Sequence, residues 1–186
     1  IFDFSPWSMG QLGNNDNNNC TEIATMNLLR YWEYCRNIKP LFFSDDYQEC
    51  YSALKQLMRY DPNNGTVAKD AFNGVQEYIS DYGLHPIDGT AFEIAGEDII
   101  STEKQWNWMT THLRNNIPFI LNASCINYLG SGHGKLHSFG AVGYQATSTG
   151  NYLRVYDETD SSVSHFYNFS AWYYEVSTYW YVRWNG

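Results

Sequence analysis

The chain has 186 residues and a formal net charge of -9, with only 11 lysine and arginine residues. This balance argues against nucleic acid as a partner, because phosphate binding needs clustered positive charge. No apolar run approaches the ~20 residues that a membrane-spanning helix needs, so we expect no membrane insertion. The length predicts one domain over residues 1–186. Because the chain begins at Ile1 rather than Met, we expect a mature or trimmed protein that is secreted or lies at the cell surface.

The first part of the chain, to about residue 116, has the apolar period of helices. A helix is predicted to begin at Cys20, with Asn19 as its N-cap and Glu22 as a capping-box partner. Ser44 is the expected cap of a second helix, and Thr66 opens a third. A fourth helix is predicted from residue 102, and residues 83–100 read as an insertion or a flap.

The second part, residues 117–186, has the pattern of strands. The turn signal at residues 148–151 separates two strands, 136–145 and 152–157, which predicts a hairpin. Further strands are expected at residues 117–123, 165–169 and 172–184. Helices first and antiparallel strands later predict an α+β fold.

Cys20 is the first candidate functional residue, because it occupies the first position of the predicted helix. Unpaired backbone N–H groups and the positive end of the helix dipole favour a thiolate at that position. A thiolate is the nucleophilic form of cysteine, so Cys20 is expected to have a pKa below the usual ~8.5.

A cysteine nucleophile needs a base, and the base needs an orienting group. His137 begins one strand of the predicted hairpin and Asp157 ends the other, so both fall at its open end. Neighbouring positions across a hairpin lie ~5 to 8 Å apart. Asp157 is therefore placed to orient the His137 imidazole toward Cys20, with a bell-shaped pH profile for the coupled pair.

The run of residues 19–29 around Cys20 resembles the catalytic helix of papain-like bacterial cysteine peptidases, and is similar to the family of bacteriocin-processing peptidases. In that family a glutamine precedes the cysteine, and a histidine and then an aspartate follow it; Gln11, Cys20, His137 and Asp157 have this order. The resemblance implies a papain-like fold, hydrolysis of peptide or protein substrates through a thioester, and Gln11 as oxyanion donor. Asn14 is a rival for that last role.

The sequence departs from the family pattern directly after the cysteine. Family members usually have Gly-Pro there, whereas this chain has Thr21 and Glu22, and Glu158 follows Asp157 where proline is common. These departures leave two alternatives open. One is a non-catalytic module that binds peptides or glycans, with aromatic clusters at residues 172–174 and 179–181, and the other is an acyl-transfer enzyme such as an amidase or a transglutaminase-like protein.

No cofactor and no metal site is predicted. His133 and His137 have the spacing of a zinc pair, but the glycines around His133 indicate a loop rather than a helix. The four cysteines form no C-x-x-C pair. Cys35, Cys50 and Cys125 are expected to be buried and inert.

Overall fold

The computed structural model describes residues 5–12, 16, 18–38, 40–82, 90–94, 102–125, 135–157, 165–169 and 176–182, with only the backbone at 90–94, 102, 123–125, 135–136, 157 and 176–182. The helices are α1 (Met9–Leu12), α2 (Cys20–Arg36), α3 (Tyr47–Leu57), α4 (Ala68–Asp81) and α5 (Thr102–Arg114). The strands are β1 (Thr90–Ile94), β2 (Phe119–Cys125), β3 (Lys135–Thr147), β4 (Gly150–Asp157), β5 (His165–Asn168) and β6 (Val176–Val182). The expected α+β class is confirmed.

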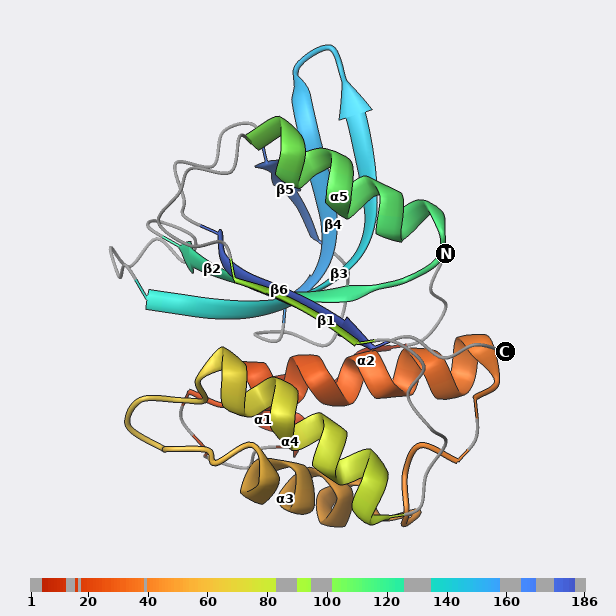
Figure 1. Ribbon diagram of the computed structural model, residues 1–186, viewed down its shortest axis with the longest axis vertical. Helices are drawn as coiled ribbons and strands as arrows, with labels where there is room; N and C mark the ends of the chain where they lie inside the picture. The colour runs from red at the N-terminus through yellow and green to blue at the C-terminus, as the bar shows by residue number, and fades with distance from the viewer. Residues whose placement is uncertain are drawn as a thin grey trace.

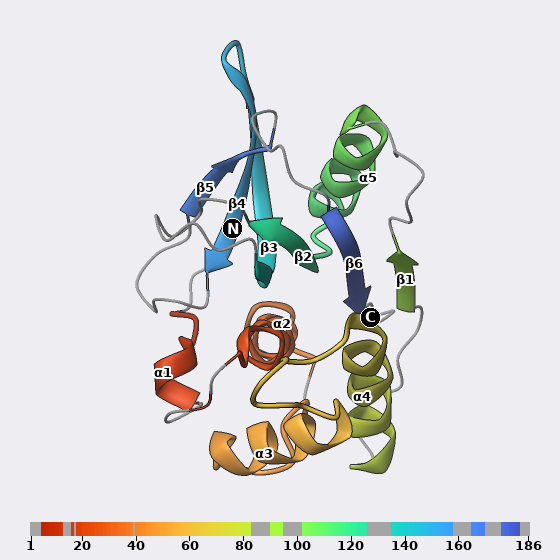
Figure 2. The same ribbon diagram turned by 90° about the vertical axis from the view of Figure 1, so that its left-hand side faces the viewer.

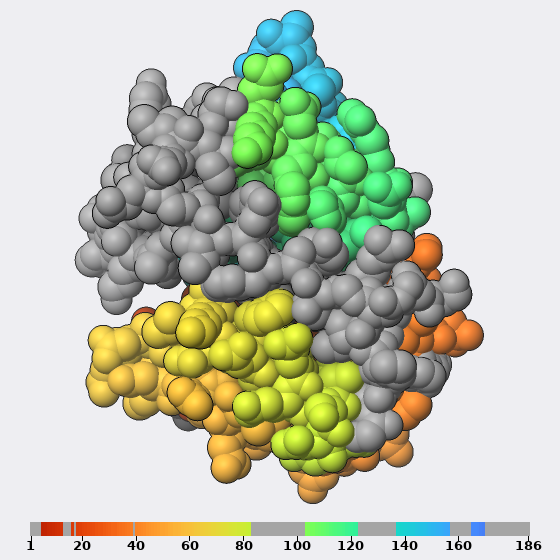
Figure 3. Space-filling view, in the orientation of Figure 1, coloured from red at the N-terminus to blue at the C-terminus, as the bar shows by residue number. Residues whose placement is uncertain are grey.

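The six strands form one antiparallel sheet in the order β1-β6-β2-β3-β4-β5. Helix α5 lies on one face of the sheet and α2 on the other, with α3 and α4 beneath α2 (Figure 1). Figure 2 looks nearly along α2 and shows it between the sheet and α3, with α1 and α4 at either side. On the face drawn in Figure 3, α4 in yellow-green and α5 in green form separate parts of the surface.

Helix α2 is the central helix, because every side of its N-terminal half after Cys20 is buried. Residues 21–29 are all buried, so one side packs on the sheet and the other on α3 and α4. The last turn leaves the core, and Cys35 is exposed there. The expectation that Cys35 is a core residue is therefore wrong, whereas Cys50 is buried in α3 as expected.

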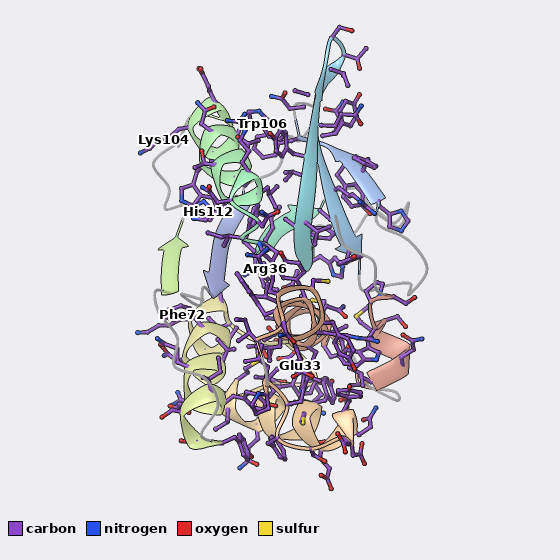
Figure 4. The ribbon with its side chains drawn as sticks, turned by 90° about the vertical axis from the view of Figure 1, so that its right-hand side faces the viewer. Glu33, Arg36, Phe72, Lys104, Trp106 and His112 are labelled. Atoms are coloured by element: carbon purple, nitrogen blue, oxygen red, sulfur yellow. The ribbon has the colours of Figure 1, made fainter. Side chains whose placement is uncertain are left out.

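Two apolar clusters lie on the two faces of the sheet. The helical core joins α2, α3 and α4 to Ile120 of β2, and the sheet core joins Met109 of α5 to Leu121 and Phe139. Trp106 reaches from α5 toward the sheet (Figure 4), where its ring lies 5.8 Å from that of Tyr144 and stacks at 5.5 Å on Phe169. Successive residues of a strand point to opposite faces, which explains why Ile120 and Leu121 join different clusters.

The predicted hairpin is confirmed, with a two-residue turn between β3 and β4. Its register contains a β-bulge, since Ala141 pairs with Val155 while Gly143 pairs with Arg154. If the register next to the turn continued without the bulge, Asp157 would lie opposite Gly140; with the bulge at Val142, Asp157 lies opposite Phe139. The bulge therefore moves the end of β4 one position closer to His137.

Two helix starts and one strand differ from the sequence prediction. The N-cap of α3 is Asp46, whose side chain accepts a hydrogen bond from the Gln48 backbone N–H, rather than Ser44. Helix α4 begins after Val67, not at Thr66. Part of the predicted insertion forms the edge strand β1, paired with β6, so the sheet also uses residues from the first part of the chain.

Candidate active site

Cys20 is the first residue of α2, as the sequence predicts, and its thiol is half-buried and outside any disulfide. Asn19 holds the N-cap position, and its backbone carbonyl accepts the first helical hydrogen bond, from Ile23, at 3.1 Å. Its side chain does not cap the helix; Asn19 Nδ2 donates to the Tyr51 hydroxyl at 3.1 Å instead. The start of α2 is thus tied to α3.

The expected capping box is also replaced by a tertiary contact. Glu22 is fully buried, and its carboxylate accepts a hydrogen bond from the Thr66 hydroxyl, in the segment before α4. Burial raises the pKa of Glu22 to about 6. The capping-box pattern identified a residue that fixes the helix start, but its partner lies 44 positions along the chain.

On its other side, the start of α2 is bonded to the sheet. Thr21 Oγ1 lies 2.7 Å from Ser138 Oγ, and Ser138 Oγ donates to Asn122 Oδ1 at 2.5 Å. All three side chains are buried. Thr21 follows Cys20 and Ser138 follows His137 in the chain. This contact therefore brings the backbone at Cys20 close to the backbone at His137.

His137 pairs with Ala123 in the sheet, and its ring meets that of Phe139 edge-on at 4.8 Å. Because side chains alternate along a strand, Ser138 faces α2 while His137 shares the opposite face with Phe139. The His137 ring is thus on the face of β3 opposite to the one that Thr21 and Ser138 share. Burial lowers the pKa of His137 to about 4, which favours the neutral imidazole.

Asp157 is the last residue of β4 and lies opposite Phe139, two positions from His137. The backbone thus places it as a diagonal neighbour of His137, as expected from the hairpin. The side chain of Asp157 is outside the described part of the structure.

Gln11 lies in the short helix α1, and its side chain is exposed. Its Oε1 accepts a hydrogen bond from the Ser8 backbone N–H at 2.9 Å, and its backbone carbonyl accepts one from Gln48 Nε2 at 3.3 Å. The preceding segment is held against α2, because the Asn27 amide bonds both the N–H and the carbonyl of Trp7. These contacts anchor α1 beside the central helix, while the rival donor Asn14 is outside the described residues.

Two further histidines lie in the described part of the structure. His112 stacks on Trp108 of α5 at 3.8 Å, and His165 begins strand β5 opposite Val155, two register positions from Asp157. His85 and His133 are outside the described residues, as is the cluster at 172–174. Among the described side chains, no group of three or more histidines, cysteines or carboxylates is arranged to hold a metal ion. None of the helices in the described ranges is both long and apolar enough to cross a bilayer.

Sequence patterns do not identify Thr21, Ser138 and Asn122 as parts of the candidate site. Thr21 stands out only as a departure from the family pattern, and Ser138 lies within the predicted strand 136–145 with no signal of its own. Each forms its hydrogen bond with a residue far away in sequence, so local patterns could not reveal the group.

Comparisons with known proteins found a matching family model and similar solved structures. The model of the Peptidase_C39-like family matches residues 8–182. The crystal structure of the Pseudomonas avirulence protein AvrPphB is similar at 12% sequence identity and a TM-score of 0.42, covering 98% of this chain and 96% of that one. A comparison with curated protein sequences gave no match.

Proposed function

The chain belongs to the Peptidase_C39-like family, and from this premise we propose that it is a cysteine peptidase with Cys20 as the nucleophile. His137 is the general base and then the general acid, Asp157 orients the imidazole, and Gln11 donates a hydrogen bond to the oxyanion. The substrate is a peptide or a protein.

One observation carries this proposal: the helix that begins at Cys20 is bonded to β3 at the residue after His137, through Thr21 and Ser138. A thiol at a helix N-terminus and a histidine at the adjoining strand are the two parts that nucleophilic catalysis by cysteine requires. Asp157, two register positions from His137, supplies the third.

In the proposed reaction, the Cys20 sulfur attacks the carbonyl carbon of the scissile bond. The oxyanion that forms is stabilised by Gln11 Nε2 and by the Cys20 backbone N–H. His137 transfers a proton to the leaving amine, the C–N bond breaks, and a thioester remains. His137 then takes a proton from water, whose oxygen displaces the sulfur and releases the acid.

The pair of Cys20 and His137 holds one proton in its active form, on sulfur or on the imidazole. Burial of His137 disfavours the form that carries two protons, thiol with imidazolium. The acidic limb of activity is therefore expected nearer pH 4 than the ordinary histidine value of ~6.5. This differs in position, not in shape, from the profile expected from sequence.

Alkylation of the native protein tests the activated thiol, and Cys35 is a matched control on the same helix. Cys35 is exposed near the C-terminus of α2, where the helix dipole disfavours a thiolate, whereas Cys20 is half-buried at the N-terminus. Exposure alone predicts that Cys35 reacts first with iodoacetamide; activation predicts that Cys20 does at pH 6. Tryptic cleavage after Arg30 and Arg36 separates the two cysteines for mass spectrometry.

Hydrolysis of a peptide library by wild type and by Cys20→Ala, His137→Ala and the double variant tests the catalytic roles. Each single substitution is expected to abolish hydrolysis, with no further loss in the double variant, because the pair acts as a unit. Full activity of Cys20→Ala would contradict the proposal. Faster labelling of Cys35 than Cys20, without hydrolysis, would favour the binding module, and amine-dependent products would favour acyl transfer.

A further inference from the structure

Thr21 occupies a position where the family resemblance leads one to expect glycine, and its side chain is almost fully buried. A buried hydroxyl without a partner is costly, so its hydrogen bond is part of what makes threonine acceptable there. That bond, to Ser138 Oγ at 2.7 Å, joins α2 to β3. The departure from the family pattern thus coincides with a specific contact beside the candidate nucleophile.

The direction of both hydrogen bonds follows from Asn122. An amide oxygen can only accept, so the Ser138 hydroxyl donates its proton to Asn122 Oδ1. Ser138 Oγ is then the acceptor for Thr21, whose hydroxyl donates. The chain Thr21 to Ser138 to Asn122 therefore links one helix and two strands, with each hydroxyl proton assigned to one bond.

We propose that Thr21, Ser138 and Asn122 form a positioning relay that sets the distance between the Cys20 sulfur and the His137 imidazole. The inference rests on the proposed function, since it takes Cys20 and His137 as the catalytic pair. Each is the chain neighbour of a relay residue, so the 2.7 Å bond fixes two backbones that carry the reacting groups.

The alternation along β3 explains why such an anchor matters. Ser138 faces α2, whereas the His137 ring lies with Phe139 on the other face. The packing of α2 on the Ser138 face of β3 therefore does not by itself hold the imidazole against the thiol. The bond from Thr21 to Ser138 joins the chain neighbours of both groups, and an error of about 1 Å in the separation of reacting groups can cost about 100-fold in rate.

Thr21→Val keeps the shape of the side chain and removes its hydroxyl, and Ser138→Ala removes the central one. Each is expected to lower kcat about 10- to 100-fold with KM changed less than about threefold, since the substrate contacts remain. The double variant is expected to be no worse than the poorer single variant, because one break already separates helix from sheet. Thr21→Ser keeps the hydroxyl and is expected to retain most of the activity.

Thr110→Val is the control for loss of a buried threonine hydroxyl. Thr110 is buried in α5, and among the described residues its hydroxyl bonds only within that helix, to the carbonyls of Trp106 and Asn107, so kcat is expected to be unchanged. A second readout is the iodoacetamide rate of Cys20 across pH. Thr21→Val and Ser138→Ala are expected to move this profile toward that of an ordinary thiol, whereas Thr110→Val leaves it in place.

The outcomes separate the relay from the proposed function. If Cys20→Ala is inactive but Thr21→Val and Ser138→Ala match wild type in kcat and in labelling, the relay is wrong and the peptidase proposal stands. Lower thermal stability of these variants with an unchanged labelling profile of the folded protein also overturns the relay. If Cys20→Ala is active, the proposed function fails and the relay with it.

Discussion

Glu22 lies two residues after the proposed nucleophile and is fully buried. One carboxylate oxygen accepts from Thr66, while the other, Oε2, has no hydrogen-bond partner among the described residues. Lys55 lowers its pKa and Asp16 raises it, but burial is the largest effect and raises the pKa to about 6. The ionised form is thus less favourable in the folded protein than in the unfolded chain.

The consequence is a stability that falls as pH rises. Below the unfolded-state pKa of 4.5, Glu22 is protonated in both the folded and the unfolded protein, so its ionisation does not affect stability. Between pH 4.5 and about 6, Glu22 ionises in the unfolded chain but stays protonated in the folded protein, so the free energy of unfolding decreases as pH rises. Above pH 6 this decrease reaches about 2 kcal/mol. Glu22→Gln keeps an acceptor for Thr66 and cannot ionise, so it is expected to be more stable than wild type by about that amount at pH 7.5.

Urea unfolding of wild type and Glu22→Gln at pH 4.5 and 7.5 measures this difference. Most of the gain should be present at pH 7.5 and little at pH 4.5. A gain of equal size at both values would show that the amide packs better, and that ionisation of Glu22 has no part in stability.

The close packing of α4 against the end of α3 depends on Gly74. A Cβ atom built there would lie 2.6 Å from Met58 Cγ and 2.7 Å from the Met58 backbone N and Cα. Alanine favours a helix over glycine by about 1 kcal/mol, but here it forces two helices apart, and overpacking typically costs about 1–3 kcal/mol. Gly74→Ala is therefore expected to lower the free energy of unfolding.

Gly10→Ala in α1 is the matched control, because no atom of the described residues lies within 4 Å of a Cβ atom at that position. It is expected to leave the free energy of unfolding unchanged or to raise it slightly. Denaturant unfolding of both variants compares them directly. Stabilisation by Gly74→Ala would mean that α3 and α4 are not in contact as described.

Sequence patterns predict those helices and strands whose signals come from neighbouring residues. The period of apolar residues predicted α3 and α4, and the turn signal after Thr147 predicted the hairpin of β3 and β4. The Val142 bulge, the edge strand β1 and the start of α4 were missed. Thr66 is the instructive case: its hydroxyl bonds Glu22 of α2 rather than capping its own helix, and only the tertiary fold supplies that partner.

The same limit applies to the candidate site. Local patterns were enough to select Cys20, since its helix start is visible in the sequence, and the hairpin placed His137 and Asp157 at one end. The face that His137 shares with Phe139, and the bond from Thr21 to Ser138, both depend on how α2 docks on the sheet. Docking is set by contacts more than 100 positions apart, which local periodicity does not report.

In the whole molecule, the sheet separates two clusters, and only one of them includes the helix that carries Cys20. Ile120 and Leu121 are adjacent on β2 and both fully buried, Ile120 in the helical core with α2 and Leu121 in the sheet core with α5. They therefore form a matched pair for asking whether the active site depends on overall stability or on the α2–sheet interface.

Ile120→Ala and Leu121→Ala each remove a fully buried aliphatic side chain, so both are expected to cost about 2–5 kcal/mol in the free energy of unfolding. Their effects on the site should differ. Ile120→Ala leaves a cavity beneath α2 and loosens the docking on which the placement of Cys20 against His137 depends, whereas Leu121→Ala loosens α5 and the packing of Phe139, against which the His137 ring lies, but leaves the α2–sheet interface in place. At a temperature where both variants are folded, iodoacetamide labelling of Cys20 at pH 6 should slow more in Ile120→Ala than in Leu121→Ala. Equal slowing in the two variants would mean that reactivity follows global stability, and that the α2–sheet interface has no separate role.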